Sequence, residues 1–393
     1  MSDTVSIKEL LKGVKVEWKS LGEVAKLTRG RVMSKMYLVE NAGEYPVYSS
    51  QTANNGEIGK INTFDFDGEY VSWTTDGANA GTVFYRKGKF SITNVCGLIK
   101  IQDTLELNYK YLFYWLSISA KKYVYSGMGN PKLMSNQVEK IQIPIPPLKV
   151  QSEIVKILDN FTELTAELTA ELTARKKQYS YYRDKLLSFE DNEVEWKSLG
   201  NIGQVIRGNG MQKKDFIENG FPAIHYGQIY TKYGLTANKT FTFVSKELSQ
   251  KLKIAKNNDL LIATTSENDD DVLKPIAWLG KETAISGDMM LFRHNENVKY
   301  LAYYFQTTLF QKQKRKYITG TKVRRVSKDN IEKLTIPIPP LKKQEEIVAI
   351  LDKFDTLTNS ISEGLPREIE LREKQYEYYR DMLLSFPKPK VEV

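Results

Sequence analysis

The sequence predicts an α+β fold in which two α/β domains, in a pseudo-twofold arrangement, are separated by two long antiparallel helices that form a coiled-coil spacer. Three observations support this prediction. First, several segments of the sequence occur twice. Second, the apolar residues that follow one of these segments recur with helical spacing. Third, the stretches between the duplicated segments combine strand, turn and helix signals.

The repeated segments define the domain organisation. They recur in the same order at growing offsets: 16–22 (VEWKSLG) at 194–200, 143–149 (IPIPPLK) at 336–342, and 181–189 (YYRDKLLSF) at 378–386 (YYRDMLLSF). The two halves diverge between these markers. We therefore expect four parts: a first domain (1–143), a central helix (144–190), a second domain (191–336) and a C-terminal helix (337–393).

The shared blocks have the pattern of helices. Apolar residues from Ile154 to Phe189 alternate spacings of three and four, which is typical of coiled coils, and a helix over 148–189 would be roughly 60 Å long. The second copy begins in the same way but contains a helix stop and restart at 364–366 (GLP). We expect the two helical regions to pair antiparallel as a rigid spacer.

A short unit occurs in tandem in the central helix, TAEL at 165–168 and again at 169–172. Two interpretations remain open. The unit consists simply of good helix-forming residues with Leu at every fourth position, or it sets the length of the spacer by gain or loss of units.

The variable blocks look mixed. The pattern predicts strands at 70–73, 82–85 and 260–264, turns at 54–56 and 76–79, and aromatic-rich helices at 109–122 and 300–316.

Charge indicates an acidic partner. The chain has 57 Lys and Arg against 48 Asp and Glu, a net charge of +9, and seven cations occur between 311 and 327 without an acidic residue. Nucleic acid is the commonest partner of such a chain. The single cysteine, Cys96, excludes an internal disulfide and any multi-cysteine metal site. The lack of long apolar runs and of a signal-like N-terminus predicts a cytoplasmic protein.

Catalytic motifs are missing from the sequence. It contains neither a GxxxxGK[ST] phosphate-binding loop nor the [ND]PP[YF] motif of methyltransferases. The acidic run at 267–271 is either a solvated loop or a Mg²⁺ site, and we favour the loop. We therefore expect no catalytic residues, no metal and no cofactor.

Two unlike domains, two like helical regions with IPIPPLK junctions, and the tandem TAEL unit together resemble the specificity (S) subunit of type I restriction–modification systems, over essentially the whole chain. The resemblance implies two target-recognition domains, each reading one half of a bipartite DNA site across a non-specific gap. It also implies that the helices set the gap and bind two methyltransferase (M) subunits, through which two restriction–translocation (R) subunits join. Adenine methylation, ATP hydrolysis and DNA cleavage would belong to those other chains.

Candidate DNA contacts are residues that can read base edges or hold phosphates. The strongest prediction is the loop 317–325, which precedes the second proline junction and corresponds to 125–132 in the first domain. In the first domain the candidates are Arg29, Arg31, Ser49, Ser50, Gln51, Thr52, Asn54, Asn55, Thr75, Asn79, Ser126, Met128, Asn130 and Lys132. In the second domain they are Arg207, Lys213, Lys214, His225, Tyr226, Gln228, Tyr230, Thr265, Ser266, Asn268, Lys316, Thr319, Thr321, Lys322, Arg324 and Arg325.

Two other functions remain open at this point. One is a stand-alone methyltransferase or nuclease with unrecognised motifs. The other is a structural coiled-coil scaffold that carries two protein-binding domains. Binding to double-stranded DNA that weakens as salt rises would separate the DNA-recognition hypothesis from the scaffold.

Overall fold

The structure is a computed structural model, and it describes residues 9–127, 129–190, 193–360 and 362–387. Contacts divide the chain into two compact units: unit 1 comprises Met1–Ala166 with Arg372–Val393, and unit 2 comprises Glu167–Leu371. Each unit contains one of the two variable blocks and parts of both helical regions. Among the described residues, none of the helices has both the length and the apolar character needed to cross a bilayer.

The first domain, in unit 1, is built on a six-stranded sheet with the order β2-β7-β5-β6-β3-β4. All neighbouring pairs in it are antiparallel except β3 with β6. Its strands are β2 (Ala25–Arg29), β3 (Ala42–Tyr48), β4 (Glu57–Ile61), β5 (Phe66–Thr74), β6 (Val83–Ile92) and β7 (Cys96–Ile101). Its short helices are α2 (Leu21–Val24), α3 (Lys35–Glu40), α4 (Tyr109–Ser119) and α5 (Ser135–Val138), with 3₁₀ turns η1 (Ala53–Gly56) and η2 (Ala120–Tyr123).

The second domain, in unit 2, has two main sheets, with the orders β10-β19-β15-β17-β12 and β13-β11-β18-β14, and a two-stranded ladder β16-β20. Its strands are β10 (Gly203–Arg207), β11 (Phe221–Ile224), β12 (Thr236–Ala237), β13 (Thr242–Val244), β14 (Lys253–Ala255), β15 (Leu260–Ala263), β16 (Thr265–Ser266), β17 (Lys274–Trp278), β18 (Thr283–Ile285), β19 (Met289–His294) and β20 (Arg324–Arg325). Its helices are α7 (Leu199–Ile202), α8 (Tyr226–Thr231), α9 (Lys246–Ser249), α10 (Val298–Phe305), α11 (Thr308–Arg315) and α12 (Lys328–Glu332), with the 3₁₀ turn η3 (Lys213–Asp215).

The sequence repeats form the base of each domain. In unit 1, β1 (Glu17–Ser20) pairs antiparallel with β8 (Gln142–Ile145), so the first and last residues of the domain lie side by side. In unit 2, β9 (Glu195–Ser198) pairs with β21 (Thr335–Ile338) in the same way. The VEWKSLG and IPIPPLK segments are thus similar in both halves because they build the same closing ladder.

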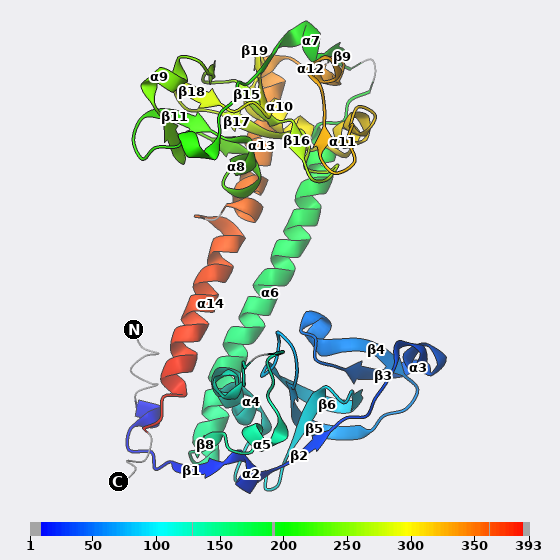
Figure 1. The fold of residues 1–393 in the computed structure, drawn as a ribbon, viewed down its shortest axis with the longest axis vertical. Helices are drawn as coiled ribbons and strands as arrows, with labels where there is room; N and C mark the ends of the chain where they lie inside the picture. Colours follow the sequence, from blue (N-terminus) through cyan, green and yellow to red (C-terminus); the bar gives the residue numbers. More distant parts are fainter. Residues whose placement is uncertain (1–8, 128, 191–192, 361, 388–393) are drawn as a thin grey trace. The chain divides into compact units, whose positions relative to one another are not determined.

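The long helices confirm the predicted α+β class with paired antiparallel helices. Figure 1 shows α6 (Leu148–Leu186) as one uninterrupted helix, whereas the second shared block forms α13 (Leu341–Asn359) and α14 (Gly364–Leu383). In unit 1, Phe161 of α6 stacks on Tyr379 of α14 with ring centroids 5.3 Å apart. In unit 2, Tyr182 of α6 stacks on Phe354 of α13 at 5.5 Å. Later residues of α6 meet earlier residues of its partner, so the helices run antiparallel.

The break in the second helical block lies slightly before its predicted place. α13 ends at Asn359, and Gly364 begins α14 with φ +77°. A Cβ on Gly364 would lie 2.4 Å from the carbonyl oxygen of Thr356. Only glycine fits both this backbone conformation and this close approach, so the GLP signal marks the restart of the helix.

A buried glutamine attaches each domain to its long helix. Gln151, fully buried in α6, accepts a hydrogen bond from the Asn108 backbone N–H (2.9 Å) and donates to the Pro146 carbonyl (2.8 Å). Gln344 in α13 makes the same two contacts with Asn297 (3.0 Å) and Pro339 (2.9 Å). Asn108 and Asn297 are the N-caps of α4 and α10, so the glutamines fix the start of these helices.

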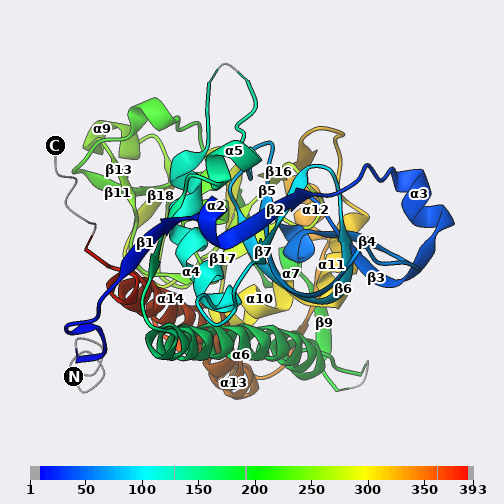
Figure 2. The same cartoon turned by 90° about the horizontal axis from the view of Figure 1, so that it is seen from below.

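A second attachment lies about two turns further along each long helix. Asp159 of α6 accepts from Lys110 (2.5 Å) and Tyr114 (2.7 Å) of α4, which packs on β5 and β6 on its other side and lies beside α6 in Figure 2. Asp352 of α13 accepts from Lys299 and Tyr303 of α10, both at 2.7 Å. Each domain is therefore held to its helix by the same four polar side chains.

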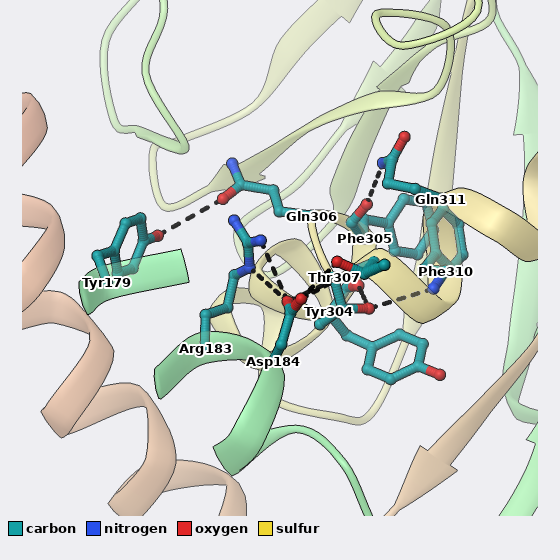
Figure 3. A network of polar contacts seen from close by, with 10 residues as sticks. Tyr179, Arg183, Asp184, Tyr304, Phe305, Gln306, Thr307, Phe310 and Gln311 are labelled. Carbon is teal, nitrogen blue, oxygen red and sulfur yellow. Dashed lines mark hydrogen bonds and ion pairs between the residues drawn. The ribbon is translucent and has the colours of Figure 1, made fainter. Parts of the chain in front are cut away.

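One predicted helix is wrong in detail. The aromatic-rich segment 300–316 was expected to be a single helix, but it divides into α10 and α11. The hydroxyl of Thr307 accepts from the Phe310 backbone N–H (3.2 Å) as the N-cap of α11. Asp184 of α6, which lies beside Thr307 in Figure 3, also accepts from the backbone N–H of Thr308 (3.3 Å), a group that an uninterrupted helix would direct into its own ladder.

Candidate DNA interface

In the first domain three chain segments meet around Thr75, which follows β5. Arg29, the last residue of β2, donates from Nη2 to the Thr75 hydroxyl (3.1 Å) and to the Asn94 carbonyl (2.8 Å). The Leu133 backbone N–H donates to the Thr75 carbonyl (2.9 Å). The end of the edge strand β2, the end of the central strand β5 and the loop before the proline junction thus form one surface.

The loop before the junction is a closed hairpin. Tyr125 and Lys132 exchange backbone hydrogen bonds of 2.8 and 2.9 Å, and Asp76 forms a bridge with Lys132. The predicted contacts Ser126, Asn130 and Lys132 are exposed on this hairpin, while Met128 lies outside the described residues.

The second domain repeats this arrangement with other side chains. Arg207, the last residue of β10, donates to the Gly287 carbonyl (3.4 Å), and the Val326 backbone N–H donates to the Thr264 carbonyl (3.3 Å). Thr319 and Arg325 exchange two backbone hydrogen bonds of 2.9 Å, as Tyr125 and Lys132 do in the first domain. The two domains share a backbone scaffold at this place and differ in what it presents.

The basic loop of the second domain (317–325), with the end of α11 before it, is partly neutralised by the acidic run 267–271. Asp269 Oδ1 lies 2.8 Å from Arg324 Nε as an ion pair without hydrogen-bond alignment, and Asp270 pairs with Arg315 at 2.9 Å. Lys314 is fully buried and donates to the Asp270 and Val272 carbonyls, both at 2.7 Å. Its burial lowers the pKa of Lys314 to about 8. The acidic run is therefore held against the basic loop.

No metal site accompanies this acidic run: within the described ranges, no group of three His, Cys, Asp or Glu side chains could hold a metal ion. Asn268, a predicted contact, is instead engaged inside the run, where it donates to Asp271 Oδ2 (2.7 Å) and accepts from the Asp271 backbone N–H (2.8 Å).

Some predicted contacts do not face the surface. Thr75, Thr265 and Gln228 are buried, so their side chains support the surface and do not present themselves to a ligand. Asn79 is half-buried, and its carbonyl accepts from the Thr74 hydroxyl. In the sequence, a polar residue that supports the surface from below looks the same as one that is exposed on it, so these residues could not be told apart.

A polar cluster in the second domain surrounds the start of α8. His225 Nδ1 accepts from the Gly227 backbone N–H (3.3 Å), and burial together with nearby Lys213 lowers the pKa of His225, so its ring is neutral at pH 7. Tyr226 donates its backbone N–H to Ser286 (2.9 Å), and Tyr230 donates its hydroxyl to the Thr265 carbonyl (2.8 Å). This cluster therefore adjoins β16 and, through it, the basic strand β20.

The remaining candidates of the second domain are more accessible. Ser266 is half-buried in β16. Those with exposed side chains are Arg207, Lys213, Lys214, Lys316, Thr319, Thr321, Lys322 and Arg325. Arg325 differs from its neighbour Arg324 because none of the described carboxylates forms an ion pair with it.

In the first domain, the predicted loop 49–55 joins the same surface. The Thr93 hydroxyl donates to Ser49 Oγ (2.8 Å), and Thr93 adjoins Asn94, the acceptor of Arg29. Arg31 pairs with Asp65 (3.0 Å). Within the loop, Gln51 turns inward and donates to the Glu57 carbonyl (2.5 Å). Ser50 is half-buried, and the exposed side chains are those of Thr52, Asn54 and Asn55.

Comparisons with known proteins agree with this duplicated arrangement. The family model described as "Type I restriction modification DNA specificity domain" matches residues 14–175 and again residues 192–371. The chain is 38% identical over 411 residues to the type I restriction enzyme EcoR124I/EcoR124II specificity subunit of Escherichia coli, with 99% of each chain covered. It is 34% identical over 400 residues to a putative type I restriction enzyme specificity subunit of Haemophilus influenzae, covering 97% of this chain and 98% of that one.

Solved structures share the fold. The S subunit of a type I restriction–modification system from M. genitalium superposes with a TM-score of 0.58 at 16% identity, covering 96% of this chain and 98% of that one. A chain from a study of complex assembly and conformational transition of the type I system superposes with a TM-score of 0.59 at 16% identity, with 94% and 97% covered.

Proposed function

Because the chain belongs to the family of type I restriction–modification specificity subunits, we propose that each of its two variable domains reads one half of a bipartite DNA site, and that the helices set the gap between the halves. The family assignment establishes a non-catalytic subunit for DNA recognition, and its assembly with the other subunits of the system is part of the proposal. The division of labour between the domains is the other part.

The observation that carries this proposal is the duplicated hairpin scaffold. Leu133 donates to the Thr75 carbonyl and Val326 to the Thr264 carbonyl at equivalent places in the two domains, yet the hairpins carry different side chains. The first hairpin presents Ser126, Asn130 and Lys132, whereas the second is rich in cations. A common scaffold with different side chains is what two readers of different sequences require, because base edges are distinguished by their donor and acceptor patterns.

The continuous helix supports a fixed gap. α6 contains 39 residues and belongs to unit 1 at its start and to unit 2 at its end. At 1.5 Å per residue it is roughly 58 Å long, on the order of one and a half helical turns of duplex DNA. Stacked aromatic pairs against α14 and α13 brace it in each unit. The length of this helix is therefore the quantity that would set the gap.

Repeated exposed tyrosines support the docking of two identical partners. Tyr181 and Tyr378 occupy equivalent places in the YYRD repeat and are 61% and 59% exposed. Their neighbours Tyr182 and Tyr379 pack inward on Phe354 and Phe161. Exposed tyrosine is enriched in protein interfaces, and one surface present twice suits two copies of one partner. We assign these surfaces to the two M subunits, through which the two R subunits would join.

The decisive experiment is DNA binding by the purified chain, alone and with its cognate M subunit, followed by genome-wide mapping of methylated adenine. We expect salt-sensitive binding and a methylated sequence split by a gap of constant length. Methyl transfer from S-adenosylmethionine by the chain alone would instead indicate an enzyme. Absence of DNA binding in both preparations would indicate a scaffold.

A further inference from the structure

Arg86, at the centre of β6, is a buried cation without a carboxylate partner. Its residue is 2% exposed, and none of the described Asp or Glu side chains forms an ion pair with it. The guanidinium carbon lies 3.6 Å from the ring centroid of Tyr48 and 4.5 Å from that of Phe84, and Nε donates to Ser72 Oγ (3.0 Å). Burial lowers the pKa of Arg86, but a guanidinium remains charged at neutral pH. Cation–π contacts offset only part of such a desolvation.

The guanidinium reaches the loop 49–56. Nη1 donates to the Asn55 carbonyl (2.8 Å), and a Cβ on Gly56 would lie 3.1 Å from Nη2, so the loop closes directly on the side chain. The Ser49 backbone N–H donates to the Gly56 carbonyl (2.9 Å), which ties the two ends of the loop together.

The apex of this loop has an unusual backbone. Asn54 and Asn55 have φ of 48° and 55°, and Gly56 follows with φ of 83°. Left-handed residues that are not glycine are unfavourable, and two in succession persist only where the surroundings hold them. Both asparagine side chains are exposed, and asparagine is the side chain that pairs with the N6 and N7 edge of adenine.

One further detail indicates that Arg86 does not serve packing alone. Nη2 is buried and has no hydrogen-bond partner among the described residues. A buried charge, an unmade hydrogen bond and two left-handed residues all oppose folding, and an apolar residue on β6 would avoid the first two. The loop conformation that Arg86 holds, despite these unfavourable contributions, exposes the side chains of Asn54 and Asn55.

We propose that Arg86 is a positioning residue that holds Asn54 and Asn55 toward the DNA, and thereby sets base choice in the half-site read by the first domain. This inference rests on the proposed function. Arg86 itself touches no DNA, because its guanidinium lies beneath the loop. Its replacement therefore changes which bases are accepted and leaves the number of phosphate contacts unchanged.

The test uses the full chain in complex with its M subunits and maps methylated adenine genome-wide. In the Arg86→Lys variant one ammonium cannot reach both Ser72 and Asn55, so we expect base preference at one or two positions of one half-site to fall roughly fivefold to 100-fold. The other half-site and the slope of log affinity against log salt should stay unchanged. Lys87→Met, at the exposed neighbouring position on β6, is the matched control and should leave both half-sites as they are.

Two further variants separate the possible failures. Ser72→Ala removes the partner of Nε with little change in the core, and it should relax the same positions even if Arg86→Lys does not fold. Replacing Asn54 and Asn55 with Ala tests the loop as a reader. If this double variant relaxes one half-site while Arg86→Lys and Ser72→Ala keep wild-type preference, the role of Arg86 is overturned and the proposed function stands. If none of the three changes either half-site, the loop is no reader; a wild-type site without a constant gap would overturn the proposed function itself.

Discussion

Asp269 and Arg324 form an ion pair in the second domain, with 2.8 Å between Oδ1 and Nε. Both side chains are partly exposed, and such pairs contribute about 0.2–1 kcal/mol. A DNA phosphate approaching Arg324 would have to replace the carboxylate. If the proposed interface binds DNA, the acidic run would therefore compete with a phosphate for this cation.

The first prediction concerns this competition. Asp269→Asn should raise the affinity of the chain for DNA roughly 1.5- to 5-fold, since the ion pair no longer has to be replaced. Its affinity should also fall more steeply with salt. The control is Glu282→Gln, which frees Lys256 from a surface ion pair of 3.6 Å elsewhere in the domain. Equal gains from the two variants would show that only net charge matters.

The second prediction concerns the basic strand β20. Replacing Arg324 and Arg325 with Ala should weaken DNA binding and reduce the salt slope by about one for each lost phosphate contact. Arg325→Ala alone should weaken DNA binding more than Arg324→Ala alone, because Arg325 forms no ion pair with a described carboxylate. The control replaces the exposed Lys239 and Lys281 with Ala, which removes the same charge elsewhere in the domain and should weaken binding less. Unchanged affinity in the Arg324/Arg325 variant would exclude this strand as a contact.

The third prediction concerns domain independence. Exchange of residues 22–142 for those of another family member should change only one half of the recognised sequence. The exchanged segment keeps the positions of Asn108, Lys110 and Tyr114, which attach the domain to Gln151 and Asp159. Mapping of methylated sites in cells carrying the chimaera measures the outcome. A change in both halves would contradict two independent readers.

The fourth prediction concerns the tandem TAEL unit of α6. One more unit should lengthen the helix by about 6 Å and leave a net rotation of about 40°. One base pair advances about 3.4 Å and turns roughly 34–36°. We therefore expect a gap longer by one or two base pairs, with both half-sites unchanged. Methylated sites with the original gap would show that α6 does not set the spacing.

The fifth prediction concerns pH. Burial lowers the pKa of His294 to about 4, whereas the unfolded chain binds this proton near 6.5. Its contribution to stability is therefore complete above pH 6.5 and is lost as pH falls toward 4, by up to about 3 kcal/mol. Thermal unfolding at pH 7 and pH 4.5 should show a larger drop in Tm for the wild type than for His294→Leu. Equal drops would exclude His294 as the titrating group.

Local sequence signals predicted the helical framework well. The 3.5-residue repeat gave α6 to within three residues of its end, and the GLP segment marked the restart at Gly364. These features depend on neighbours along the chain, which a sequence displays directly. The division of 300–316 into two helices was missed because part of what holds it, the contact of Asp184 with Thr308, comes from more than a hundred residues away.

The candidate interface was predictable only as segments. Polar residues at strand ends and in loops predicted the three segments that meet at Thr75 and, in the second domain, the two that meet at Thr264. The sequence could not show that Gln51 turns inward, that Asp269 neutralises Arg324, or that Arg86 lies beneath Asn55. In the sequence Arg86 stands between Tyr85 and Lys87, where a cation would be expected on the exposed face of a strand. Its burial is set by tertiary packing, which the neighbouring residues do not reveal.

Four residues connect α13 to α14, whereas α6 has no such connection along its length. Stretched to their contour length, four residues reach about 13–14 Å. Each added TAEL unit would lengthen α6 alone by about 6 Å. The connection can absorb at most two such events before the opposing helices must also grow. This bound predicts that an α6 helix lengthened by three or more units needs a compensating insertion near Asn359.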